Sequence, residues 1–195
     1  MTDMSIRLNN SVMLISFTGA QSSGKTTLLN KARVDPLFRK WSFVPEVTRV
    51  VKRMGFDINE LGTNTTQLFI LSEHLKNHHF RNNTMLDRCI IDGLVYTRYL
   101  CETGKVDKWV YQHSKNLFDM LIDKLDIIFY TDPDIPLVDD GERSVDVDFR
   151  KRIIKIFDEV LSLPSIQHKT VRLRGDANER YETLIQNIKQ YDKIR

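Results

Sequence analysis

The sequence predicts an α/β fold in which a five-stranded parallel sheet carries helices on both faces. Short apolar runs alternate along the chain with longer segments that have helical spacing. A helical segment between successive strands is typical of right-handed crossovers in a parallel sheet. Residues 19–26 read Gly-Ala-Gln-Ser-Ser-Gly-Lys-Thr between a predicted strand and a predicted helix. That arrangement is the phosphate loop (P-loop) of proteins that bind nucleoside triphosphates.

The predicted strands are short and apolar, and they are bounded by turn residues or charges. They are residues 11–17, 43–46, 84–87, 126–131 and 169–173. Parallel α/β sheets bind ligands at the carboxyl ends of their strands. The P-loop, Glu46 and Asp87 each follow or end a predicted strand, so we expect them to share one edge of the sheet.

The predicted helices follow the strands in order. They are residues 27–33, 64–80, 92–102, 107–124, 146–163 and 175–191. Asn64 or Thr65 can cap the second helix. Gly104 separates the third helix from the fourth, and Pro164 ends the fifth.

Length and composition indicate one ordinary globular domain over residues 1–195. The net charge of +3 is too small to indicate nucleic-acid binding, although it does not exclude it. The chain has neither an apolar stretch of membrane-spanning length nor the apolar region of a signal peptide. Its two cysteines, Cys89 and Cys101, do not predict a disulfide framework. We therefore expect a cytoplasmic protein, which could form a homodimer.

The P-loop residues predict binding of ATP with Mg²⁺. Gly19 and Gly24 allow the backbone to turn its N–H groups toward the β-phosphate. Lys25 is expected to reach the β- and γ-phosphate oxygens, and the Thr26 hydroxyl to ligate Mg²⁺. The full nucleotide-binding set is Gly19, Gln21, Ser22, Ser23, Gly24, Lys25, Thr26 and Thr27.

Asp87 is the main candidate for catalysis beyond the P-loop. A carboxylate at a strand end can accept a proton from a hydroxyl substrate or bind Mg²⁺ through water. Asp92 follows five residues later and equally suits a helix cap. Glu46 and Arg49 follow the second strand and could hold sugar hydroxyls or a phosphate, but they also suit the start of a surface helix. His74 and His78 lie four residues apart without an evident third metal ligand, so we expect structural or surface roles.

Residues 132–152 are interpreted as a lid. They contain two prolines and the run Asp-Asp-Gly-Glu-Arg-Ser at residues 139–144. An arginine on such a segment can neutralise charge on the transferred phosphoryl group, and Arg143 is the first candidate. The alternative of a solvated charged loop carries equal weight.

At these positions the chain resembles the P-loop ribosylnicotinamide kinase domain of the bifunctional bacterial NAD-biosynthesis regulator, and related phage and bacterial AAA-like ATP-binding proteins. The resemblance covers residues 12–190 and rests on residues 19–27, Glu46 with Arg49, the strand ending at Asp87, and residues 138–144. It implies transfer of the ATP γ-phosphate to a nucleoside 5′-hydroxyl. The pair Asp87-Arg88 is also similar to the acid–arginine pair of deoxynucleoside kinases. On this basis Lys25, Asp87 and Arg143 are expected to be catalytic, Thr26 and Asp87 to bind the metal, and the substrate set to be Glu46, Arg49, Arg88 and Asp140.

Three functions remain open from the sequence. The first is a kinase acting on a nucleoside or a nucleotide, including a nucleoside monophosphate. The second is a phosphotransferase acting on a nucleic-acid end or on a hydroxymethylated base in DNA, although no basic track with interleaved aromatic residues is evident. The third is a regulatory ATPase without a phosphoryl acceptor. Asp87-Arg88 has no adjacent second carboxylate to activate water, which favours a kinase.

Overall fold

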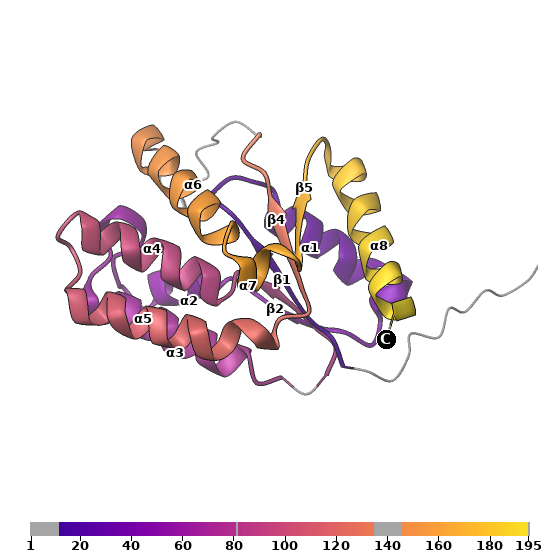
Figure 1. Cartoon of the computed structure of the whole chain (residues 1–195), viewed down its shortest axis with the longest axis horizontal. Coiled ribbons are helices and arrows are strands. Elements are labelled where there is room, and N and C mark those ends of the chain that lie inside the picture. The colour runs from indigo at the N-terminus through magenta and orange to yellow at the C-terminus, as the bar shows by residue number, and fades with distance from the viewer. Residues whose placement is uncertain (1–11, 81, 135–145, 195) are drawn as a thin grey trace, which may run out of the picture.

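The computed structural model describes residues 12–80, 82–134 and 146–194. Its sheet confirms the predicted architecture, with five strands that pair in parallel throughout in the order β2-β3-β1-β4-β5 (Figure 1). The strands are β1 (Leu14–Thr18), β2 (Ser42–Val44), β3 (Thr84–Asp87), β4 (Ile127–Thr131) and β5 (Thr170–Leu173).

Helices and short 3₁₀ turns connect the strands. The helices are α1 (Lys25–Val34), α2 (Val47–Arg53), α3 (Asn64–Asn77), α4 (Ile90–Glu102), α5 (Lys108–Leu121), α6 (Val147–Leu161), α7 (Pro164–Gln167) and α8 (Ala177–Ile194). The 3₁₀ turns are η1 (Pro36–Phe38), η2 (Asn59–Leu61) and η3 (Ile122–Lys124). None of the helices in the described part of the chain has the length and apolar character needed to cross a bilayer.

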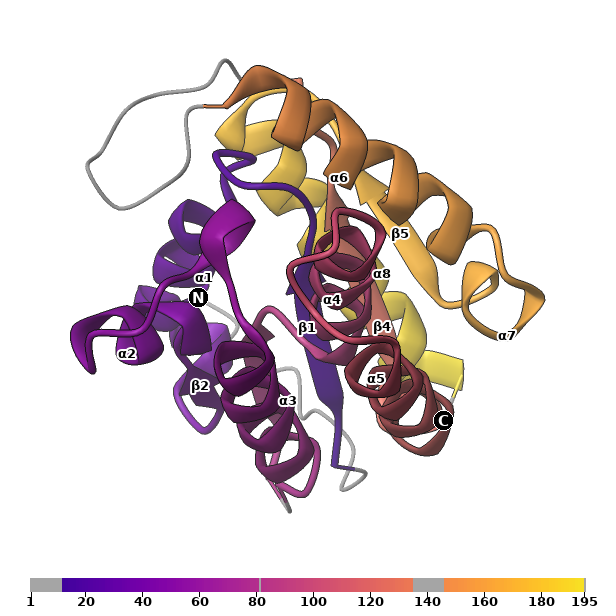
Figure 2. The same cartoon turned by 90° about the vertical axis from the view of Figure 1, so that its left-hand side faces the viewer.

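The two faces of the sheet are covered by different helices. Alternate strand residues such as Ile15, Phe17 and Phe129 pack against α1 and α8. Their neighbours, such as Leu14 and Ile128, face the opposite side and pack against α4, α5 and α6. Figure 1 shows α1 and α8 on one side of the strands and α4 and α5 on the other. The view of Figure 2 shows α2 and α3 beside the β2 side of the sheet.

The helix boundaries differ from the predicted ones at several points. Thr63, rather than Asn64 or Thr65, caps α3, because its side chain accepts a hydrogen bond from the Thr66 N–H at 3.3 Å. The helix predicted from residue 92 begins at Ile90, since Asp92 lies in its first turn and accepts a hydrogen bond from the Cys89 N–H. Pro164 begins α7, where its missing N–H costs no helical hydrogen bond.

Helix α2 is not among the predicted helix ranges, although the start of a surface helix was the alternative considered for Glu46 and Arg49. It has only seven residues, and Glu46 precedes it without a side-chain capping hydrogen bond. Its stability comes from packing: Val47 and Val51, four residues apart, are buried against Ile70 of α3. A short helix held by such contacts gives little local signal, which explains why the sequence pattern did not define its range.

The sheet order brings the P-loop and Asp87 together. Strands β1 and β3 are neighbours, and Phe17 of β1 lies opposite Asp87 in the register. The chain enters the P-loop two residues after Phe17, so the carboxyl ends of both strands open onto the same edge. The expected convergence of these features is therefore confirmed for the backbone.

Candidate active site

The P-loop has the backbone turns that its glycines predict. Gly19 and Gly24 have φ angles of 138° and 86°, and Ser22 also lies in the left-handed region at 55°. A Cβ atom on Gly19 would lie 2.9 Å from the carbonyl oxygen of Thr131, so only glycine fits there without a shift of the backbone. The loop leads directly into the first turn of α1.

Lys25 lies inside this loop. Its Nζ atom donates hydrogen bonds to the carbonyl oxygens of Gly19 at 2.9 Å and Ala20 at 2.6 Å, and to the Ser23 hydroxyl at 3.0 Å. Burial, with a contribution from the nearby Arg88 charge, lowers the pKa of Lys25 to about 7. An ammonium group in this position lies close to any anionic oxygens bound within the loop.

Thr26 and Asp87 form a contact between α1 and β3. The Thr26 hydroxyl donates to Asp87 Oδ2 at 2.9 Å, while Asp87 Oδ1 is buried and has no hydrogen-bond partner within the described residues. Burial raises the pKa of Asp87, and the Glu46 charge acts in the same direction. A carboxylate oxygen without a partner next to a hydroxyl fits Mg²⁺, which prefers oxygen ligands and is usually completed by phosphate oxygens and water.

Arg88 connects four parts of the site. Its Nε donates to Glu46 Oε1 at 2.6 Å, and its Nη1 donates to Asp92 Oδ1 at 2.7 Å and to the Gly19 carbonyl at 3.0 Å. The guanidinium also lies 5.4 Å from the centroid of the Tyr96 ring. Arg88 has a φ angle of 74°, an uncommon value for a residue with a side chain, which its surroundings must stabilise.

The Glu46 carboxylate is held ionised at the carboxyl end of β2. Burial opposes its charge, but Arg88 and Lys25 outweigh that effect and hold the pKa of Glu46 well below its usual range. Glu46 Oε1 also accepts a hydrogen bond from the Thr48 hydroxyl at 2.7 Å, and Arg49 Nε lies 3.3 Å from Oε2. Glu46 therefore presents a negative, fixed carboxylate.

Asp92 has the helix-capping role considered for it and also contacts β1 and Arg88. It caps α4 through the Cys89 N–H, and its Oδ2 accepts a hydrogen bond from the Thr18 hydroxyl at 2.7 Å. Its other oxygen binds Arg88. Asp92 thus fixes the start of α4 against both β1 and the arginine.

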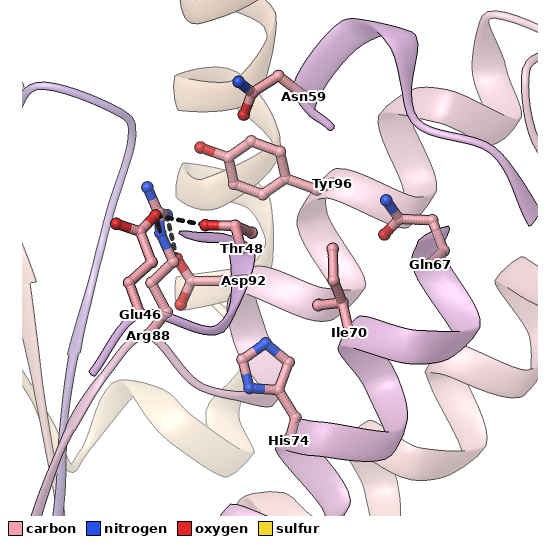
Figure 3. A pocket seen from close by; sticks show the side chains of 10 residues that line it. Glu46, Thr48, Asn59, Gln67, Ile70, His74, Arg88, Asp92 and Tyr96 are labelled. Carbon is pink, nitrogen blue, oxygen red and sulfur yellow. Dashed lines mark hydrogen bonds and ion pairs between the residues drawn. The ribbon is translucent and has the colours of Figure 1, made fainter. Parts of the chain in front are cut away.

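A pocket opens beside these residues (Figure 3). Figure 3 shows the ionic group of Glu46, Arg88 and Asp92 on one side and Gln67 and Ile70 on the other. Among the described residues, the lining comes from one stretch of the chain, 46–96. Its members are Glu46, Thr48, Asn59, Gln67, Ile70, His74, Arg88, Asp92, Gly93 and Tyr96. The pocket thus combines a charged end with uncharged polar and apolar walls.

Sequence reasoning did not assign Asn59, Gln67, His74 or Tyr96 to a binding site. Gln67 and His74 are two helical turns apart on α3, so they share a face that periodicity alone identifies as core. Both are buried, and the Gln67 side-chain oxygen accepts a hydrogen bond from Thr97 at 2.9 Å. Polar residues on an otherwise apolar helix face were the available signal.

The remaining predicted site residues do not line the pocket or lie outside the described residues. Arg49 lies next to Glu46 but does not line the pocket, and Thr27 is exposed in the first turn of α1. Asp140 and Arg143 lie outside the described residues. Within the expected lid segment, residues 147–152 form the start of α6, where Phe149 is buried in the core.

Two other arginines of the expected lid segment, Arg150 and Arg152, lie on α6. Arg150 Nη2 donates to the carbonyl oxygen of Pro133 at 3.4 Å. Arg152 pairs with Glu102 of α4. Arg152 is therefore held on the α4 side of the fold by a carboxylate partner.

Comparisons with known proteins agree with this geometry. A family model described as an AAA domain matches residues 14–180. No curated protein matches the chain. Among solved structures, the chain is similar to NadR protein in complex with NR, with a TM-score of 0.74 and 18% identity over 94% of this chain and 52% of that one.

Two further structures have the same fold. NadR protein in complex with NAD and AMP-PNP has a TM-score of 0.70 and 17% identity over 94% of this chain and 50% of that one. Deoxyadenosine kinase from M. mycoides with the products dCMP and a flexible dCDP has a TM-score of 0.70 and 13% identity, over 91% of this chain and 99% of that one. The chain spans about half the length of the NadR structures.

These likenesses confirm the predicted P-loop kinase type of fold, with its parallel sheet and covering helices. The family match runs from the first residue of β1 to within α8. The chain therefore belongs to the AAA-domain family whose model spans residues 14–180.

Proposed function

We propose that this protein is an ATP-dependent kinase that transfers the γ-phosphate to a hydroxyl group of a nucleoside. One observation carries the proposal: Lys25 and Asp87, the partner of Thr26, interact electrostatically with Glu46 and Arg88, and these two residues line the pocket together with Asp92. The P-loop and the pocket thus share one ionic group. The NR complex of NadR and the product complex of deoxyadenosine kinase support a nucleoside or nucleotide ligand in this fold.

Binding of ATP with Mg²⁺ is assigned to the P-loop side of this arrangement. The loop N–H groups and Lys25 would bind the β- and γ-phosphates, and Thr26 and Asp87 would hold Mg²⁺. When bound, the metal neutralises negative charge on the phosphate oxygens. Lys25 contributes a second positive charge to the same oxygens, and the buried loop keeps that charge close to them.

Glu46 is assigned to the acceptor hydroxyl. It lines the pocket, whereas Asp87 does not. Its ionised carboxylate can accept a hydrogen bond from the hydroxyl, orient the oxygen and take its proton as the phosphoryl group is transferred. Asp87 then acts on the metal side. Phosphoryl transfer depends mainly on positioning and charge stabilisation, so a fixed carboxylate suits this step.

The charges of the pocket favour a nucleoside over a nucleotide as acceptor. Its described lining contains two carboxylates, Glu46 and Asp92, and one guanidinium, Arg88, which pairs with both. His74 stays neutral, since burial lowers its pKa to about 3. A phosphate monoester would add two negative charges to a lining that already has an excess of negative charge.

An acceptor screen with γ-labelled ATP tests the proposal. The purified protein is incubated with nucleosides, nucleoside monophosphates and DNA carrying hydroxymethylated bases, with Lys25→Ala as the blank. Label in nucleoside 5′-phosphates is the expected result. Label only in nucleotides or in DNA would identify a different acceptor. Inorganic phosphate formed at the same rate with every acceptor would indicate a regulatory ATPase.

A further inference from the structure

Arg180 of α8 is a buried arginine that contacts the P-loop from the side opposite the pocket. Its side chain is 1% exposed. Nη1 donates to the Ser23 carbonyl oxygen at 2.7 Å, and Nε donates to the Gly175 carbonyl oxygen at 2.8 Å. Nη2 donates to the Asp132 carbonyl oxygen at 3.2 Å and pairs with the Asp134 carboxylate.

This arrangement links three segments that lie far apart in the sequence. One guanidinium binds the P-loop, the chain just after β4 and the turn before α8. Burial of an arginine is costly unless its donors are satisfied, and here Nε, Nη1 and Nη2 all have partners. These contacts fix the start of α8 against the sheet, but the bond to Ser23 has a second consequence.

The Ser23 carbonyl belongs to the same peptide group as the Gly24 N–H. In a trans peptide the C=O and the N–H point in opposite directions. A carbonyl held toward Arg180 therefore directs the Gly24 N–H away from Arg180. Gly24 has a φ angle of 86° and immediately precedes α1, so this peptide is next to a helix N-terminus whose N–H groups suit phosphate binding.

We propose that Arg180 is a positioning residue for nucleotide binding. It holds the Ser23–Gly24 peptide in the orientation in which the P-loop N–H groups bind the phosphates. Without it, that peptide is free to rotate, and the loop must be reordered each time a nucleotide binds. The inference rests on the nucleotide binding proposed above and extends it to a residue outside the P-loop, 157 positions away from Ser23 in the sequence.

Titration calorimetry with MgADP tests this role without a phosphoryl acceptor. The full-length wild type is compared with Arg180→Met and with Arg180→Lys, which keeps the charge but loses the forked geometry. Arg172→Met is the matched control, because Arg172 also binds Asp132, at 2.9 Å. Its other contacts are with Asp158 and the Tyr130 ring rather than with the P-loop. Circular dichroism and thermal melting establish that each variant is folded.

We expect MgADP affinity to fall roughly tenfold or more in Arg180→Met, the usual loss for one hydrogen bond to a charged group, and several-fold in Arg180→Lys. Arg172→Met should stay within about twofold of the wild type. The Gly24 amide signal of the ligand-free protein should shift in an ¹⁵N spectrum of Arg180→Lys and not in that of Arg172→Met.

Wild-type affinity in folded Arg180→Lys, with an unmoved Gly24 signal, would overturn the inference and leave Arg180 a purely structural residue. If Arg180→Met does not fold, Arg180→Lys decides the question. Failure of the wild type to bind MgADP would overturn the proposed nucleotide binding itself. The two failures are therefore distinguishable.

Discussion

The Thr26 hydroxyl donates a hydrogen bond to Asp87 Oδ2 at 2.9 Å, which joins the first turn of α1 to the carboxyl end of β3. The two residues are 61 positions apart in the sequence. They meet because β1 and β3 are neighbouring parallel strands and both end at the same edge. This contact defines the side of the site to which we assign the metal.

Replacing Asp87 by asparagine should separate the effect of its charge on catalysis from the effect of its size. Asp87→Asn keeps the size of the side chain but removes the negative charge next to Thr26. We expect kcat to fall by about 10²–10⁴ and half-maximal activity to require more Mg²⁺, because a neutral amide is a poorer metal ligand. Steady-state kinetics over a Mg²⁺ series measures both. Unchanged turnover in a folded variant would remove Asp87 from the site.

Loss of the Lys25 charge should abolish most phosphoryl transfer. Lys25→Ala removes the ammonium group assigned to the β- and γ-phosphate oxygens, so we expect kcat to fall by at least about 10². Lys31→Ala is the matched control, because Lys31 lies on the same helix but pairs with Asn178 at its surface. Labelled-ATP assays on both variants make the comparison. Wild-type rates in Lys25→Ala would contradict the P-loop assignment.

Glu46 should affect the transfer step more than nucleotide binding. Glu46→Gln removes the carboxylate assigned to the acceptor hydroxyl, and we expect kcat to fall by about 10²–10³ with MgADP affinity changed less than about threefold. Glu73→Gln on α3 is the control, since Glu73 is partly exposed and pairs only locally with Lys76. Steady-state kinetics measures the loss of kcat, and calorimetry measures the MgADP affinity. Equal losses in turnover and in MgADP affinity would argue against this role.

Acid should destabilise the protein through two buried histidines. Burial lowers the pKa of His74 to about 3 and that of His78 to about 4, below the value of 6.5 for an unfolded chain. Below about pH 6.5 the unfolded chain binds protons that the folded chain does not. The free energy of unfolding should therefore fall as the pH falls, by about 1.4 kcal/mol per pH unit for each histidine.

His74→Gln tests that dependence. It should reduce the slope of unfolding free energy against pH by about 1.4 kcal/mol per unit between about pH 6 and pH 5. His113→Gln, which replaces an exposed histidine, is the control. Urea denaturation at several pH values gives the slopes. A wild-type slope in His74→Gln would show that His74 is protonated at the same pH in both states.

The fold was predictable because its signals are local. Apolar runs mark the strands, and the P-loop spacing marks the turn between β1 and α1. The pocket was less predictable, because its walls depend on tertiary contacts. Helix α2 is stabilised by Val47 and Val51 against α3, and Gln67 and His74 resemble core positions until the surrounding helices are in place. The role proposed for Arg180 depends on a contact with Ser23, 157 positions away in the sequence, and a local sequence pattern cannot predict such a contact.

The described pocket walls come from one continuous stretch, residues 46–96, whereas the nucleotide side that we propose uses the P-loop, Asp87 and a contact from α8. Substitutions within that stretch can alter the choice of acceptor while the residues that bind ATP stay the same. A new acceptor preference can therefore arise by substitution of the lining residues within this stretch, with Asp87 kept. The fold separates the evolution of what receives the phosphate from the evolution of what supplies it.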